Sequence, residues 1–136
     1  MHFSTTFASA AMLVLGARAA LPVASIEFQS WSDCPAGDLA DGKPVSVAEV
    51  ATTPVTCDKT PVSRQWNVDF FSFKALMDTK EAKLCSGVYA WNNDDCSGEP
   101  WSFLPFDGEG VVQGQCLPDS LDPTYLSFQL SCYGYY

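Results

Sequence analysis

Six cysteines in a chain of 136 residues constrain the fold of this protein more than any other feature. Even the two nearest ones, Cys85 and Cys96, are far apart, so the chain lacks the Cys-x-x-Cys pairs that are typical of metal sites. An even number of widely spaced cysteines predicts disulfide bonds and an oxidising compartment, although the count alone leaves the pairing open. The six residues are Cys34, Cys57, Cys85, Cys96, Cys116 and Cys132.

Residues 1–19 predict a secretory signal peptide. Positions 7–16 form a short apolar run, whereas a helix needs about 20 apolar residues to cross a bilayer. Ala17-Arg18-Ala19 supplies the small residues that precede a cleavage site, which places the mature N-terminus at Ala20. We therefore expect a single domain over residues 20–136, secreted to the extracellular space, with no inserted membrane segment.

The charge of the chain excludes several functions. Asp and Glu number 16 against 7 Lys and Arg, which gives a formal net charge of −9. This acidic balance disfavours binding to nucleic acids and to anionic membranes, which both need clustered cations. The one histidine, His2, lies in the expected leader, so the mature chain has no imidazole for catalysis or metal binding. A non-enzymatic protein without a cofactor is predicted.

The chain repeats itself loosely in residues 26–73 and 85–132. Each segment has an Asp-Cys pair, at Cys34 and at Cys96, after a short apolar strand. A second cysteine follows at a similar distance, Cys57 in the first segment and Cys116 in the second. An apolar strand that contains a serine then closes each segment. Agreement at several positions indicates two copies of one four-strand unit.

This repeat suggests how the cysteines pair. Equivalent cysteines would form one bond within each half, and the remaining two would join the opening and closing strands of the second half. The predicted disulfides are Cys34–Cys57, Cys96–Cys116 and Cys85–Cys132.

Short strands and frequent turns predict an all-β fold, namely a small disulfide-stapled β-sandwich built from two Greek-key halves. The clearest strand is residues 126–132, where apolar residues alternate with Ser127, Gln129 and Ser131. Residues 74–84 leave two alternatives open. They form either a helix with a capping box at Asp78 or a β-hairpin that turns between Met77 and Lys80.

A resemblance to a protein family rests on three short motifs. They are Val-Tyr-Ala-Trp at 88–91, Asp-Asp-Cys-Ser-Gly at 94–98 and Leu-Ser-Phe at 126–128, roughly doubled along the chain. This pattern resembles fungal small secreted cysteine-rich proteins with βγ-crystallin or killer-toxin-like Greek keys, over about residues 26–132. Neither half matches the aromatic corner of the crystallin signature in full. The resemblance implies an effector-like or toxin-like protein, and we expect a monomer that acts on a host protein or a cell-wall glycan.

Exposed aromatic residues are the predicted surface-binding site. Trp91 and Phe128 are expected in the core, whereas turns or the chain end surround the others. Flat exposed rings stack on sugars and anchor interfaces, so a carbohydrate-binding module is an alternative function. The candidate residues are Trp101, Tyr133, Tyr135 and Tyr136.

A weaker pattern concerns calcium. Asn93, Asp94 and Ser97 are similar to the calcium loop of βγ-crystallins, but Gly98 replaces the final Ser of that loop. Such residues also form ordinary hairpin turns, and we expect no metal here.

Three carboxylates make a small glycoside hydrolase a further alternative. Glu99, Asp107 and Glu109 could supply an acid and a base, provided that two of them face each other across a cleft.

Overall fold

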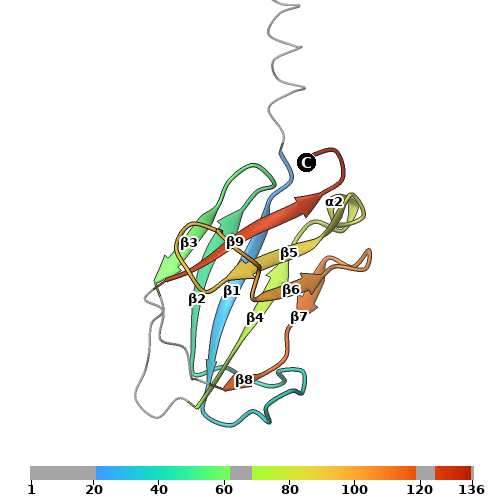
Figure 1. Ribbon diagram of the computed structural model, residues 1–136. Helices are drawn as coiled ribbons and strands as arrows, with labels where there is room; N and C mark the ends of the chain where they lie inside the picture. Colours follow the sequence, from blue (N-terminus) through green and yellow to red (C-terminus); the bar gives the residue numbers. More distant parts are fainter. Residues whose placement is uncertain (1–20, 62–68, 119–124, 136) are drawn as a thin grey trace, which may run out of the picture.

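The computed structural model describes residues 21–61, 69–118 and 125–135 (Figure 1). Within these residues the chain forms nine strands and one short helix. Their bounds, in chain order, are β1 (Ala24–Trp31), β2 (Ser46–Thr52), β3 (Asp58–Pro61), β4 (Phe70–Leu76), α2 (Thr79–Ala82), β5 (Cys85–Trp91), β6 (Ser102–Pro105), β7 (Val111–Gln113), β8 (Leu117–Pro118) and β9 (Tyr125–Cys132).

The strands form two antiparallel sheets that pack face to face. The first sheet has the order β2-β1-β4-β7, and the short β8 also pairs with β4. The second sheet has the order β3-β9-β5-β6. In Figure 1, the neighbouring strands β9 and β5 cross over β1 and β4, which belong to the other sheet. The predicted all-β, disulfide-stapled sandwich is confirmed.

The core lies between the sheets because alternate residues of each strand point inward. Phe28, Phe73 and Ala75 come from the first sheet, and Val88 and Phe128 come from the second. The Phe73 and Phe128 rings meet edge to face across this core, with their centroids 5.4 Å apart. One continuous cluster of buried side chains therefore holds the two sheets together.

The two halves of the chain exchange their third strands. In the first half, β1, β2 and β4 lie in the first sheet, whereas β3 pairs with β9 of the second. In the second half, β5, β6 and β9 lie in the second sheet, whereas β7 pairs with β4 of the first. Each sheet thus contains the first, second and fourth strands of one half and the third strand of the other. The strand orders of the two halves are equivalent.

This exchange corrects two of the predicted disulfides. The structure pairs Cys34 with Cys116 and Cys57 with Cys96, not Cys34 with Cys57 or Cys96 with Cys116. Because the third strand of each half lies in the other sheet, its cysteine is carried away from the Asp-Cys loop of its own half. Both bonds therefore join a loop after the first strand of one half to the third-strand region of the other. The third bond, Cys85–Cys132, agrees with the prediction.

The segment between the halves follows neither predicted alternative in full. β4 continues to Leu76, since Ala75 pairs with Ile26 of β1 and is buried, and this pairing overrides local helix propensity. Only the single turn α2 is helical, and Asp78 caps it by accepting a hydrogen bond from the Lys80 N–H (2.9 Å). A hairpin is not formed because β4 and β5 belong to opposite sheets. No helix in the described part of the chain is long and apolar enough to cross a membrane.

Candidate functional site

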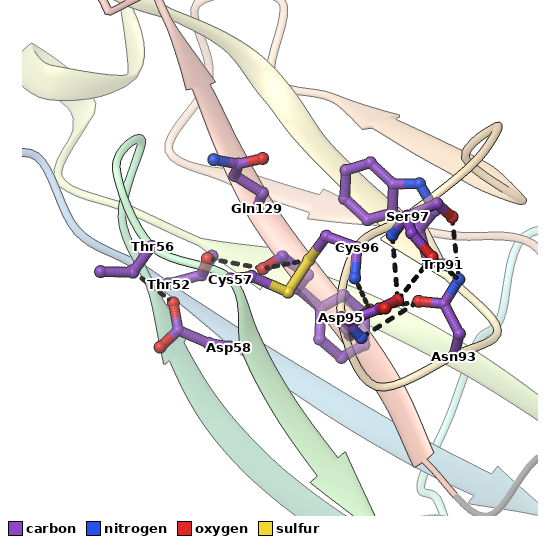
Figure 2. The surroundings of a disulfide bond; sticks show 12 residues. Thr52, Thr56, Cys57, Asp58, Trp91, Asn93, Asp95, Cys96, Ser97 and Gln129 are labelled. Atoms are coloured by element: carbon purple, nitrogen blue, oxygen red, sulfur yellow. Dashed lines mark hydrogen bonds between the residues drawn. A yellow bond between two sulfur atoms is a disulfide. The ribbon is translucent and has the colours of Figure 1, made fainter.

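Residues 92–98, which we call the Asx loop, join β5 to the turn before β6 and carry half of a disulfide (Figure 2). Asn93 Oδ1 accepts the Asp95 N–H (3.3 Å), and Asn93 Nδ2 donates to the Ser97 carbonyl (2.8 Å). Asp95 Oδ1 accepts the Ser97 hydroxyl (2.6 Å). These bonds are the Asx and serine turns expected of such residues, and they fix the position of Cys96 beside Cys57.

Ser127 of β9 anchors the Asx loop to the outer face of the second sheet. Its hydroxyl donates to Asn93 Oδ1 (3.1 Å) and accepts the Cys96 N–H (3.1 Å). Trp91 adds a bond from its Nε1 to the Gly98 carbonyl (3.1 Å). Ser127 is fully buried, although the sequence alternation placed it on the polar face of its strand. The loop covers that face, and the serine hydroxyl is the group that holds it there.

Replacing Ser127 with alanine is expected to lower the free energy of unfolding by about 1–3 kcal/mol, because the Cys96 N–H and the Asn93 side-chain oxygen would both lose a partner. Urea unfolding of the oxidised protein measures the change. Ser131→Ala is the matched control, since Ser131 lies on the same strand and is partly exposed. Its stability should stay within about 0.5 kcal/mol of the parent. Equal losses in both variants would contradict an anchoring role for Ser127.

The residues of the predicted calcium loop are engaged within the loop itself. Asn93 bonds to Ser127 and Ser97, and the Ser97 hydroxyl bonds to Asp95. Asp94 is exposed. Among the described residues, no group of three or more His, Cys, Asp or Glu side chains is placed to hold a metal ion. The local geometry is that of Asx and serine turns within the connection between β5 and β6.

The predicted surface aromatics differ in their surroundings. Trp101 is 37% exposed, yet its ring stacks on Phe71 (5.5 Å between centroids) and meets Phe73 edge to face (5.9 Å). It therefore closes the edge of the core, and only part of it faces solvent. Tyr133 and Tyr135 are exposed, as predicted. Tyr136 lies outside the described residues, and the predicted core residues Trp91 and Phe128 are buried.

Two further aromatic side chains form an exposed pair that the sequence did not single out. Tyr89 of β5 and Phe103 of β6 are directly paired in the sheet, and their ring centroids lie 4.6 Å apart. They are 37% and 39% exposed. The exposure of Tyr89 could have been predicted from residues 88–91, where alternation turns Val88 and Ala90 inward and Tyr89 outward. We call this pair the aromatic shelf.

Cavities border the shelf on the Phe103 side. The larger one has a volume of about 420 Å³ and also touches Lys83, Ser86, Asp107 and Tyr133. A second cavity of about 290 Å³ lies where β6 faces the end of β7, and Phe103 borders this one as well. The shelf thus continues into a hollow that offers a cation, a carboxylate and hydroxyl groups, the kinds of group that orient a small polar ligand.

The three carboxylates of the glycosidase alternative do not gather at this hollow. Asp107 borders the larger cavity, whereas Glu99 and Glu109 are not among its lining residues. Glu109 instead follows a turn in which its N–H donates to the Phe106 carbonyl (2.8 Å). Among the described residues, Asp107 is the single carboxylate in the lining, and hydrolysis of a glycosidic bond uses a pair.

Comparison of the chain with protein-family models, with curated proteins and with solved structures finds no match.

Proposed function

We propose that this chain is a secreted, non-enzymatic protein that acts at a host or cell-wall surface, in the manner of a fungal effector or toxin-like protein. The observation that carries the proposal is the exposed aromatic shelf beside a polar hollow, on a sandwich whose halves are joined by disulfides. Large aromatic side chains in solvent are characteristic of binding surfaces.

Secretion is supported by two independent features. The expected leader precedes the domain, and three disulfides cross-link a chain of only 136 residues. Disulfides persist in oxidising compartments, and small extracellular domains use them to supplement a limited core. Two halves of equivalent strand order share one sandwich, which agrees with the duplication that the sequence predicts.

Binding is favoured over hydrolysis by the chemistry of the hollow. Its described lining combines one carboxylate with one lysine and with aromatic and hydroxyl groups. Such a set can hold hydroxyl groups of a ligand by hydrogen bonds, whereas a glycosidase needs a second carboxyl group about 5–10 Å from the first. The hollow is therefore better suited to recognition than to catalysis.

Expression of the full chain with its own leader in a yeast host tests the proposal. We expect the protein in the culture medium, with Ala20 as its first residue and all six cysteines oxidised. The purified protein should then be retained on intact fungal or plant cell walls and should release no reducing sugar from them. A reduced and alkylated sample, in which the disulfides are broken, is the control for retention by a folded surface.

Two results would contradict the proposal. One is retention of the chain inside the cell with its leader uncleaved. The other is a correctly oxidised, secreted protein that binds neither cell walls nor the surface of host cells.

A further inference from the structure

We propose that the aromatic shelf and the adjoining hollow bind a neutral polysaccharide chain. This inference rests on the proposed function, because it names the ligand class of the surface at which that function would operate. Three features of the molecule identify the occupant: the contrast between its two sheets, the shape of the shelf with its hollow, and the charge of the chain.

Equivalent positions of the two sheets can be matched through their fourth strands. Ser72-Phe73 in β4 corresponds to Ser127-Phe128 in β9, since both are the fourth strands of their halves and both pairs are buried. In the second sheet, Gln129 follows this pair on β9 and lies opposite Tyr89 of β5. On its other side, Tyr89 lies opposite Phe103 of β6.

The equivalent position in the first sheet is charged. There, Glu27 lies opposite Glu49 on one side and Lys74 on the other. An outer sheet face normally carries polar residues of this kind. The same fold therefore tolerates charge at this position, and the aromatic rings of the second sheet are not required for packing the sandwich. Their exposure indicates a binding role.

The shelf is shaped by a glycine beneath it. Gly87 lies under Phe103, and a β-carbon at Gly87 would come within 2.7 Å of the Phe103 ring. The absence of a side chain lets the ring lie close to the backbone of β5. The Tyr89 and Phe103 ring centroids lie 4.6 Å apart at an interplanar angle of 36°, so the two side chains pack against each other and present one apolar patch. A pyranose ring presents a face of C–H groups that packs on such a surface and leaves its hydroxyl groups at the edge.

The hollow beside the shelf offers partners for those hydroxyl groups. Sugar hydroxyl groups are both donors and acceptors, so they need partners of both kinds. Lys83 supplies donors, the Asp107 carboxylate supplies acceptors, and the hydroxyl of Tyr133 supplies either. A volume of about 420 Å³ lies within the range of small-ligand sites. A sugar stacked on the shelf would thus have a neighbouring unit in hydrogen-bonding surroundings.

The charge of the chain selects a neutral ligand. A formal net charge of −9 repels anionic polymers and anionic membranes. The side chains of Tyr89, Phe103 and Gln129 are uncharged. A neutral glycan meets no net repulsion from the acidic chain, which makes it the best match among extracellular polymers.

The double variant Tyr89→Thr/Phe103→Thr tests the inference, since threonine retains strand propensity and removes both rings. The oxidised proteins are incubated with insoluble β-1,3-glucan, chitin and cellulose, and with immobilised polygalacturonate as the anionic polymer. The parent should bind at least one neutral polymer, and the double variant should bind it at least about tenfold more weakly, as expected for the loss of about 1.4 kcal/mol.

The matched control is Glu27→Thr/Glu49→Thr, which makes the same substitution at the equivalent position of the first sheet. It should bind as the parent does. An unchanged far-ultraviolet circular dichroism spectrum and a cooperative urea transition show that each variant is folded. The variant Asp107→Asn keeps the size of that side chain and should also weaken binding, because it removes the charged acceptor from the hollow.

Three outcomes would overturn the inference: no retention of the parent on any neutral polymer, equal retention of the shelf variant, or stronger binding to polygalacturonate. Retention on intact walls without binding to purified neutral polymers would indicate a protein partner, and the proposed surface function would stand. Binding to a neutral polymer by a chain that is not secreted would remove the proposed function and leave the inference standing.

Discussion

Replacing Cys57 and Cys96 together with alanine is expected to lower the free energy of unfolding by about 4 kcal/mol. The bond joins cysteines with a sequence separation of 39, and cross-linking such a loop restricts the unfolded chain to that extent in the loop-entropy treatment. Because small domains are stable by only about 5–15 kcal/mol, the loss should be evident as a large drop in the urea midpoint under non-reducing conditions.

The same bond also has a local role that distinguishes it from the other disulfides. It ties the start of β3 to the Asx loop, so its removal should increase amide hydrogen exchange in both places. The control is the double variant of Cys85 and Cys132, which removes a bond within the second half with a similar sequence separation of 47. Exchange should then increase at the start of β5 and the end of β9.

Peptide mapping of the oxidised protein tests the pairing directly. The expected links are those between Cys34 and Cys116 and between Cys57 and Cys96. A link from Cys34 to Cys57 would contradict the exchange of third strands. A loss of stability below about 1 kcal/mol in the Cys57/Cys96 variant would show that the bond does not constrain the unfolded chain as loop entropy requires.

The sequence predicts which cysteines are equivalent, but not how they pair. Repetition of the Asp-Cys motif identifies Cys34 and Cys96 as equivalent, and in the structure each lies in the loop after the first strand of its half. Which cysteine each one meets depends on the sheet that receives the third strand. That choice is made by long-range pairing of β3 with β9 and of β7 with β4, which no local pattern records.

The outer faces of the sheets show a similar limit. Period-two alternation correctly turns Leu126, Phe128 and Leu130 into the core. It also turns Ser127 outward, but it cannot show that the loop after β5 covers this serine. Alternation likewise turns Tyr89 outward, and only its pairing with Phe103 across two strands makes a surface feature of it.

Replacing Phe128 with alanine is expected to lower the free energy of unfolding by about 3–5 kcal/mol, the usual range for truncating a buried phenylalanine. The side chain is fully buried, and its ring meets Phe73 edge to face at the centre of the core. Because Phe73 occupies the equivalent position of the other half, Phe73→Ala should have a loss of similar size. Urea unfolding of the two variants measures both values.

A cycle of the single and double leucine variants at these positions isolates the contact between the rings. Leucine fills most of the space, so each single loss should be smaller than for alanine, and the coupling between the two should be about 0.5–1.5 kcal/mol. Phe103→Thr is the control for loss of an aromatic ring at an exposed position, and it should alter stability far less than Phe128→Ala. A coupling near zero would mean that the two halves are joined by strand exchange and disulfides without help from this pair. A clear coupling would show that equivalent residues of the two halves stabilise each other directly across the sandwich.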